Sequence, residues 1–186
     1  MTVLDARQSN PREGGASFSL RHRLLRLVWG MVWGVLGRPS PVPFHGWRRR
    51  LLRLFGAKIS GTARVYPSAV IWYPPNLAMG EHAVLGPGVI CYCMDRISVG
   101  DYAIVSQRSH LCGGTHDPDD PYFQLQPKPI TIGAKAWIAA EAFVGPGIAI
   151  GEGAVVGARG VAVKNVPAWE IWAGNPARKI RDRARF

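Results

Sequence analysis

The sequence is poor in cysteine and in long apolar runs. Its 186 residues include three cysteines, Cys91, Cys93 and Cys112, which are too few and too clustered for a disulfide framework. No stretch reaches the ~18–20 apolar residues that a membrane-spanning helix needs. The nearest, residues 27–37, is flanked by arginines and followed by no small-residue cleavage site. These absences argue against a secreted or membrane-spanning protein and favour the cytoplasm.

Acidic residues are also scarce, with 12 against 23 basic residues and a net charge of +11. The positive charge lies at the ends, because residues 1–55 carry +8, residues 56–175 carry −1 and residues 176–186 carry +4. A nucleic-acid-binding protein would carry a basic stripe on its folded body, so no nucleic-acid partner is expected. Basic ends suit an anionic membrane surface, an anionic cofactor or plain solubility.

The basic N-terminal part divides into a tail and a helical segment. Residues 1–17 are polar, contain Pro, Gly and Ser, and are expected to form a flexible tail. Residues 18–55 are predicted to be a basic amphipathic helical segment with one helix over 18–37 and another over 44–55. The apolar stripe of the first helix consists of Leu20, Leu24, Leu27, Met31 and Val35. Two interpretations stay open, in which the helices pack against the core or lie on the inner face of the cytoplasmic membrane.

From residue 59 onward the chain repeats every six residues. The clearest run is IGAKAW, IAAEAF, VGPGIA, IGEGAV and VGARGV over residues 132–161. The first position is mostly Ile, Val or Leu, the second is often Gly, and the fifth is small or aliphatic. Six residues per side and eighteen per turn predict a solenoid with three flat sides, in which each coil buries its aliphatic residues against the next. Glycine in the second position is expected where a Cβ would clash or where φ is positive.

The predicted fold is therefore all-β, with a parallel β-solenoid over residues 56–175 and a basic C-terminal tail over residues 176–186. The repeat breaks at residues 113–131. Loops of this length without a pattern of their own are often functional. This loop carries His116, Asp117 and Tyr122, so it is the place where we expect chemistry.

At this point the motifs resemble a known family. The hexads are those of the left-handed parallel β-helix (hexapeptide-repeat) acyltransferases. The segment GTHDPDDPYFQLQPKPITIGAKAWIAAEAF, followed by VPAWEIWAGNPARKI, is similar to the WcaF-type branch of colanic acid biosynthesis acetyltransferases. That branch is related to the maltose, galactoside and nodulation O-acetyltransferases. The resemblance implies a left-handed coil, a homotrimer with active sites between subunits, acetyl-CoA as the donor and transfer of the acetyl group to a hydroxyl.

The resemblance assigns the catalytic base to His116. An attacking hydroxyl must lose its proton, and histidine is suited to accept it near pH 7. Asp117, a backbone carbonyl or another carboxylate could orient the imidazole ring. Asp117 and Tyr122 are expected to contact the acceptor. Relatives carry Asn in the position of Cys93, where that residue helps to place the acceptor, so the cysteine is a departure at the same contact.

The resemblance also implies where the donor binds. Small residues would let the pantetheine arm of CoA approach the backbone, and basic residues would bind its phosphates. The matched residues are Trp137, Ala139, Ala140, Gly145, Gly157, Ala158, Lys164, Arg178 and Lys179. For Trp137 an ordinary outward aromatic is the alternative, and for Arg178 and Lys179 a solubilising tail.

Three of the other histidines and the cysteines are expected to have no chemical role, whereas for His110, just before the loop, a packing or acceptor-contact role stays open. His22 and His45 are expected at the surface, and His82 on a solvated side of a coil. The pair Cys91 and Cys93 lacks the second pair of ligands that a zinc site needs and is expected to pack. A thioester is already activated, so no metal is expected.

The sequence therefore predicts an acetyl-CoA-dependent O-acetyltransferase that acts on a sugar or lipid-linked saccharide in exopolysaccharide synthesis. Catalysis would take place in a ternary complex with a histidine as general base. Two alternatives stay open. One keeps the fold and donor but changes the acceptor to a serine, an amino sugar or an antibiotic, and the other is a non-catalytic scaffold.

Overall fold

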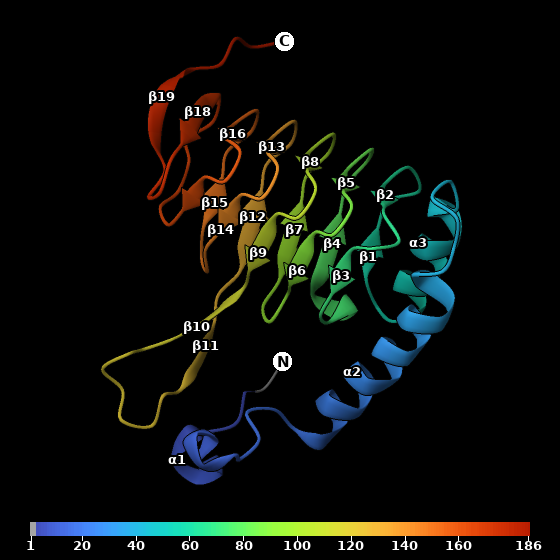
Figure 1. Ribbon diagram of the computed structural model, residues 1–186, viewed down its shortest axis with the longest axis vertical. Helices are drawn as coiled ribbons and strands as arrows, with labels where there is room; N and C mark the ends of the chain where they lie inside the picture. The colour runs from blue at the N-terminus through green and yellow to red at the C-terminus, as the bar shows by residue number, and fades with distance from the viewer. Residues whose placement is uncertain (1–2) are drawn as a thin grey trace.

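The solenoid forms a prism with three parallel sheets as its sides. A computed structural model describes residues 3–186, and Figure 1 shows successive coils stacked side by side. Sheet 1 consists of β1 (Lys58–Ile59), β4 (Leu77–Met79), β7 (Ile97–Val99), β12 (Ile130–Ile132) and β15 (Ala149–Ile150). Sheet 2 consists of β2 (Arg64–Val65), β5 (Val84–Leu85), β8 (Ile104–Val105), β13 (Trp137–Ile138), β16 (Val155–Val156), β18 (Glu170–Ala173) and β19 (Arg178–Asp182). Sheet 3 consists of β3 (Val70–Ile71), β6 (Ile90–Tyr92), β9 (His110–Cys112), β14 (Phe143–Val144) and β17 (Val161–Ala162). The three-sided solenoid predicted from the hexads is confirmed.

The strand register shows how the coil changes along the prism. In the first coils the partners lie twenty residues apart, as in Val70↔Ile90 and Ile90↔His110. Across residues 113–131 the offset rises to 33, as in His110↔Phe143. After that insertion it falls to 18, as in Phe143↔Val161. The insertion therefore leaves the stack without disturbing the pairing of the coils on either side.

The core of the prism is built from the first and fifth positions of the hexads. Ile138 and Val144 in first positions and Ala142 in a fifth position are fully buried. Cys91 fills a first position and is also buried, so the expectation that Cys91 and Cys93 pack is confirmed. Most fifth positions hold alanine because the interior of a coil is narrow and closely packed, and Val89 and Ile148 are larger fifth residues that are also buried.

Glycine and positive φ occupy different positions of the hexad. A Cβ on Gly133, in a second position, would lie 2.6 Å from the amide nitrogen of Glu152 in the next coil. Of the two reasons expected for these glycines, the steric clash is therefore the correct one. Positive φ falls instead on the fourth position, as at His82, Lys135 and Arg159. His82 consequently lies at a corner of the prism, which corrects its expected place on a coil side.

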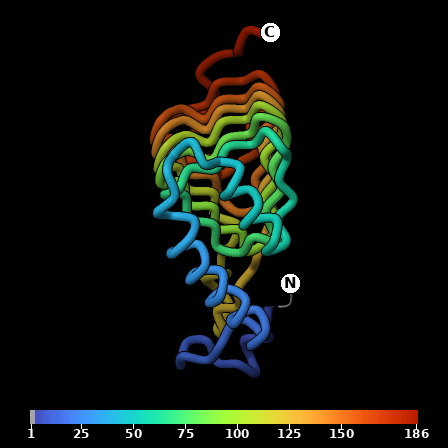
Figure 2. The backbone as a smooth tube through the Cα atoms, turned by 90° about the vertical axis from the view of Figure 1, so that its right-hand side faces the viewer, coloured from blue at the N-terminus to red at the C-terminus, as the bar shows by residue number. Residues whose placement is uncertain are grey.

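Two helices cover the N-terminal end of the prism. These are α2 (Leu20–Val32), which continues as the π-helical turn η2 (Trp33–Gly37), and α3 (His45–Leu54). Figure 2 shows both in front of the coils. The indole Nε1 atoms of Trp29 and Trp33 donate to the carbonyls of Ile71 (2.7 Å) and Ala69 (2.9 Å) in the first coil. The packing interpretation is thus correct for this face of α2, whereas the predicted apolar stripe lies on the exposed side.

A buried arginine fixes α3 to the prism. Arg48 is fully buried, and its Nε donates to the carbonyl of Val65 in β2 at 2.6 Å. Its NH1 donates to the hydroxyl of Ser40 (2.7 Å) and the carbonyl of Pro41 (2.8 Å) in the turn before α3. Burial lowers the pKa of this guanidinium, and the surrounding oxygens compensate for the lost water. The contact explains why a basic helix can cap an apolar coil.

The N-terminal segment carries local structure. Residues 1 and 2 of the predicted flexible tail lie outside the described residues. The remainder holds α1 (Ala6–Ser9) and η1 (Pro11–Glu13), and Val3 forms an antiparallel bridge with Phe18. The amide of Ala6 donates to Oε1 of Gln124 in the inserted loop at 2.7 Å. The tail therefore folds against residues 113–131 rather than extending into solvent.

The C-terminal end also differs from a simple tail. Residues 178–182 form β19, which pairs antiparallel with β18 and extends sheet 2. Beyond it, the Arg183 guanidinium donates to the carbonyls of Lys135 (3.1 Å) and Gly153 (2.9 Å). The basic charge of residues 176–186 is thus held on the last coils. A single strand after the hexads gives too short a pattern to be predicted from the sequence. The remaining helical turn, η3 (Pro74–Asn76), connects sheets 3 and 1.

The close approach of the coils gives a stability prediction. Gly133→Ala places a Cβ against the backbone of the next coil, so we expect a loss of about 1–3 kcal/mol in unfolding free energy and a lower Tm. Gly61→Ala is the matched control, because a Cβ there meets nothing within 4 Å. Thermal denaturation followed by circular dichroism measures both. Equal Tm values for the two variants would contradict the steric explanation of the second position.

Candidate active site

The inserted residues form a hairpin over 113–129 that projects from the edge between sheets 3 and 1, because Ile130 and Thr131 of the predicted break already lie in β12. Its strands are β10 (Gly114–His116) and β11 (Leu125–Pro127), and Figure 1 shows them leaving the stack of coils. A glycine is required where the chain leaves the stack of coils, because a Cβ on Gly113 would lie 2.8 Å from the carbonyl oxygen of Tyr92. The hairpin pairs His116 with Leu125. The sequence showed the break in the repeat but no pattern for this hairpin.

His116 is held in one orientation by Phe123. Its Nδ1 lies 2.8 Å from the carbonyl oxygen of Phe123, and the two rings stack with centroids 4.0 Å apart and planes 7° from parallel. A carbonyl oxygen can only accept, so the proton is on Nδ1 and the Nε2 lone pair is free to accept another proton. Of the three orienting groups considered from the sequence, the structure therefore supplies the backbone carbonyl and not Asp117.

The turn that presents the Phe123 carbonyl is held by Asp120. Its carboxylate accepts from the amides of Tyr122 and Gln124, both at 2.9 Å. These bonds, first the one from Gln124, and the nearby arginines Arg7 and Arg12 lower the pKa of Asp120. A carboxylate that bonds two successive turn amides rigidifies the turn. Asp120 is a positioning residue that the sequence analysis missed, since an aspartate among three in a loop carries no distinguishing pattern.

The N-terminal segment supports the same turn from the other side. The side-chain amide of Gln124 donates to the carbonyl of Leu4 at 3.2 Å. The guanidinium of Arg7 lies 5.7 Å from the ring of Tyr122, and that of Arg12 lies 5.4 Å from the ring of Phe123. Contacts of this kind are individually weak. Together they join two segments more than a hundred residues apart in the sequence.

Most of the residues that the family resemblance assigns to donor binding lie along the edge between sheets 2 and 3. Trp137 in β13 is exposed, and its Nε1 donates to the hydroxyl of Ser106 at 2.9 Å. Ala139 and Ala140 form the corner that follows, with Ala139 buried. The carbonyl of Ala140 accepts from the amide of Arg159 in the next coil at 2.9 Å. Gly157 and Ala158 continue the same corner, and Ala158 is exposed. The edge is thus lined by small side chains over exposed backbone.

Two further matched residues lie at the other edge of sheet 3. Gly145 follows β14, and its amide donates to the carbonyl of Ala162 at 2.9 Å. Lys164 follows β17 in the next coil and is exposed. This is the edge from which the His116 hairpin leaves. A single chain therefore places His116 and the Trp137–Ala158 corner on opposite edges of sheet 3.

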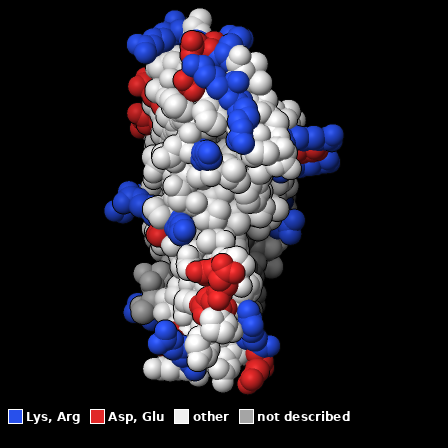
Figure 3. Space-filling model, turned by 90° about the vertical axis from the view of Figure 1, so that its left-hand side faces the viewer, with Lys and Arg blue, Asp and Glu red and all other residues white. Residues whose placement is uncertain are grey.

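The basic residues that the resemblance matches to the CoA phosphates differ in whether they form ion pairs. The turn before β19 lies over β17, because the amide of Val161 donates to the carbonyl of Gly174 at 2.9 Å. Arg178 begins β19 beside this turn and is exposed. Lys179 forms ion pairs with Asp182 (2.7 Å) and Glu170 (2.8 Å), which raise its pKa. Figure 3 shows Lys and Arg side chains gathered at this end of the molecule.

Sequence reasoning missed an arginine pair on the donor edge. Arg108 and Arg159 lie at fourth positions on either side of Glu141. The Glu141 carboxylate lies 2.6 Å from Nε of Arg159 and 3.6 Å from NH1 of Arg108, and Arg159 is the main cause of its lowered pKa. The three side chains leave one net positive charge beside Ala158. Their spacing of 33 and 18 residues matches the coil offsets, and that match is the signal that could have found them.

The residues expected to contact the acceptor are not gathered together. Asp117 and Tyr122 are exposed in the hairpin turn, near His116. Cys93 is fully buried, and its thiol donates to the carbonyl of Tyr73 at 3.2 Å. This burial corrects the expected role of Cys93: the thiol holds the segment before η3 and does not face an acceptor.

His22 is the second histidine that the structure places differently. It was expected at the surface but is buried between the rings of Phe18 (4.6 Å) and Tyr73 (4.3 Å). Burial, with a smaller effect of Arg26, lowers its pKa to about 4, so it is neutral at physiological pH. Within residues 3–186, no group of three or more His, Cys, Asp or Glu is arranged to hold a metal ion.

Comparisons with known proteins agree with this geometry. No protein-family model matches the chain. The chain is 42% identical over 156 residues to an Escherichia coli (strain K12) protein provisionally named colanic acid biosynthesis acetyltransferase WcaF, covering 84% of this chain and 86% of that one. A galactoside acetyltransferase in complex with coenzyme A superposes with a TM-score of 0.80 at 23% identity, covering 98% and 91%. A hexapeptide-repeat acetyltransferase of Vibrio cholerae O1 biovar eltor, complexed with acetyl coenzyme A, has a TM-score of 0.79 at 23% identity and coverage of 92% and 93%.

The solenoid with an inserted histidine hairpin is thus the left-handed parallel β-helix of the hexapeptide-repeat acyltransferases. Within that class, 42% identity over most of the chain shows to which branch the protein belongs. The chain belongs to the WcaF-type colanic acid biosynthesis acetyltransferases, as its motifs predicted.

The Asp120 turn gives a prediction for the hairpin. Asp120→Asn weakens both amide bonds, so we expect faster hydrogen exchange at Tyr122 and Gln124 and a fall in acetyl transfer of ~10-fold to 10²-fold as His116 loses its position. Asp119→Asn removes the same charge one residue away and leaves both bonds in place. Similar exchange in the two variants would contradict the role of Asp120.

The same turn should depend on pH. The folded pKa of Asp120 is lowered, so its stabilisation is complete above the unfolded value of ~3.9 and is lost as pH falls through the lower folded value. We expect the protection factors of the Tyr122 and Gln124 amides to be constant at neutral pH and to collapse below about pH 4. Protection that persists unchanged to lower pH would show that another contact holds the turn.

Proposed function

We propose that this protein is an acetyl-CoA-dependent O-acetyltransferase whose general base is His116. The observation that carries the proposal is the bond from Nδ1 to the Phe123 carbonyl, because in the neutral imidazole it leaves the lone pair on Nε2. Nε2 takes the proton of the acceptor hydroxyl as its oxygen attacks the thioester carbonyl. The tetrahedral intermediate then expels the CoA thiolate, which recovers the proton from the imidazolium. The products are the acetyl ester and free CoA.

The donor binds along the edge between sheets 2 and 3. Ala140, Gly157 and Ala158 leave room for the pantetheine arm, and Trp137 flanks its path. The CoA phosphates meet Arg178, with Lys179 available on release from its ion pairs. Lys164 lies at the other edge of sheet 3 and would reach the donor only from a neighbouring subunit. Arg159 and Arg108 add positive charge beside this path. CoA complexes of two structural neighbours support CoA as the donor, and the small residues of the edge support the path.

The active site is shared between subunits of a homotrimer. One chain holds His116 and the donor edge on opposite sides of sheet 3, so neither edge is complete by itself. A cyclic trimer with its axis along the prism brings the hairpin of one subunit to the donor edge of the next. The acceptor then lies between them, within reach of Asp117 and Tyr122.

The acceptor is a hydroxyl of a sugar or lipid-linked saccharide used in exopolysaccharide synthesis. Support comes from the relative named for colanic acid biosynthesis. A lipid-linked acceptor would place the reaction at the inner face of the cytoplasmic membrane, with residues 18–55 nearest to it. A screen of sugar, serine, amino-sugar and antibiotic acceptors with acetyl-CoA, read by mass spectrometry, tests the acceptor class. Acetylation of an antibiotic in place of every saccharide would overturn it.

His116→Ala should lower turnover by ~10²–10⁴, the range for a lost general base. CoA binding measured by calorimetry should be largely unchanged, since the proposed role of the imidazole is toward the acceptor hydroxyl and not toward the pantetheine arm or the phosphates. His82→Ala is the matched control, because that imidazole is exposed and stacks only on Tyr102. Near-normal turnover in His116→Ala would remove this residue from the mechanism.

A further inference from the structure

Helix α2 is apolar on two sides, and only one of them is covered. Trp29 and Trp33 are buried against the first coil. The opposite side, here called the α2 outer face, remains exposed by 51–71% at each of its residues. Those residues are Leu20, Leu24, Leu27, Met31 and Val35. Isolated apolar residues are normal on a protein surface, whereas a continuous stripe of five marks a contact with something else.

The charged residues of α2 and of the chain on either side of it are all of one sign. Residues 14–80 contain ten Lys or Arg and no Asp or Glu. Arg21, Arg23 and Arg38 are exposed on α2 and just after η2. A helix with an apolar face bordered by arginines has the composition of an interfacial helix on an anionic bilayer. Among residues 3–186 no helix is long and apolar enough to cross a membrane.

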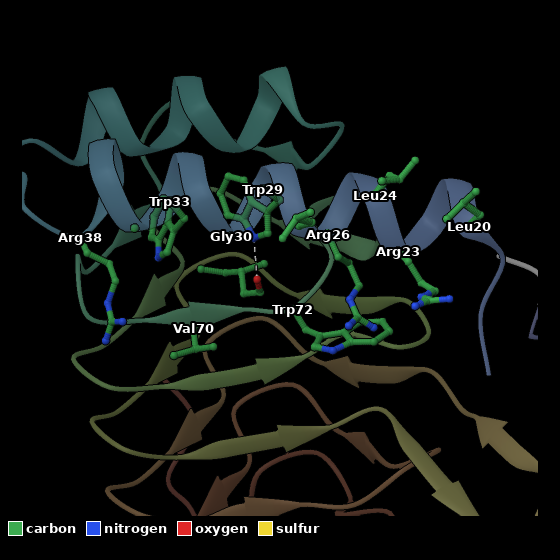
Figure 4. Close-up of a pocket in the computed structure, with 13 residues that line it drawn as sticks. Leu20, Arg23, Leu24, Arg26, Trp29, Gly30, Trp33, Arg38, Val70 and Trp72 are labelled. Atoms are coloured by element: carbon green, nitrogen blue, oxygen red, sulfur yellow. Dashed lines mark hydrogen bonds between the residues drawn. The ribbon is translucent and has the colours of Figure 1, made fainter. Parts of the chain in front are cut away.

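A groove beside α2 extends this face toward the prism. It has a volume of about 600 Å³ and lies between α2 and β3. Figure 4 shows Arg38 and Arg23 at its two ends, with Leu24 pointing away from the strands. Arg26 lies over the ring of Trp72 at 4.2 Å. The groove is distinct from the His116 hairpin and offers cationic groups at the depth of lipid headgroups.

We propose that the α2 outer face docks the enzyme on an anionic lipid surface, with the leucines in the acyl boundary and Arg21, Arg23 and Arg38 among the headgroups. A second copy of the chain is a poorer occupant. A symmetric contact through this face would oppose arginines to arginines, and residues 14–80 supply no carboxylate to separate them. An anionic bilayer supplies the missing charge.

This inference deepens the proposed function, on which it rests only for the acceptor being lipid-linked. In a cyclic trimer along the prism axis, three α2 outer faces lie at the same end and bind one flat surface together. The enzyme would then meet its acceptor at the membrane and its donor from solution.

Flotation with vesicles of phosphatidylglycerol and phosphatidylcholine in equal parts tests the docking. The full chain should float with these vesicles, less with added salt, and little with phosphatidylcholine alone. The double variant Leu24→Ser, Leu27→Ser should lose about tenfold or more of its partition coefficient. Ile180→Ser is the control, because Ile180 is equally exposed but lies in β19 at the far end of the prism. Each of Arg21→Gln and Arg23→Gln should lose about fivefold.

The outcomes separate docking from catalysis. His116→Ala should float as the wild type does, and Leu24→Ser, Leu27→Ser should acetylate a soluble acceptor at normal turnover and melt at the same Tm. Failure of the wild type to float, or equal flotation of the leucine variant, overturns the docking and leaves the acetyltransferase intact. A change in oligomeric state of the leucine variant without vesicles, measured by sedimentation, would assign the face to a second copy and also overturn it.

Discussion

The close stacking of one coil on the next is the constraint on which the molecule depends. No coil can bury its own aliphatic residues, so each is stable only between neighbours whose backbone passes within contact distance of the second-position glycines. Anything larger must leave the stack through an edge, as the His116 hairpin does. The ends of the stack must be covered, and Arg48 holds a helix there although its charge is fully buried. The groups proposed for catalysis accordingly lie at the edges of the prism.

The hexads predicted the fold because they encode that contact directly. The repeat predicted the three sides and the eighteen-residue coils, which the strand pairing confirms after the hairpin, whereas the coils before it are twenty residues long. The break in the repeat located His116 in the hairpin. The residues assigned to donor binding were found through a family resemblance. The small residues at the corner between sheets 2 and 3 give a physical reason for that assignment, because they leave space beside the backbone. Their roles in this chain stay predictions.

Other features could not be read from residue types. Helix α2 carries apolar residues on two opposite sides, so periodicity could not distinguish the face that packs through Trp29 and Trp33 from the face that remains exposed. The group that orients His116 is a backbone carbonyl, which every residue has, and its position depends on a turn held by Asp120. The resemblance to relatives with Asn at this position predicts an acceptor contact for Cys93, whereas its thiol is buried. Tertiary contacts of this kind leave no local signature.

The central claim is that one active site needs the hairpin of one chain and the donor edge of another. Mixed trimers test it most directly. His116→Ala lacks the base, and Ala158→Trp blocks the donor edge, so each should be inactive alone. When the two are co-expressed in equal amounts, about a quarter of the interfaces combine an intact hairpin with an intact donor edge, and the same share of activity should return. Activity no higher than that of the separate variants would show that each chain works by itself and would contradict the account.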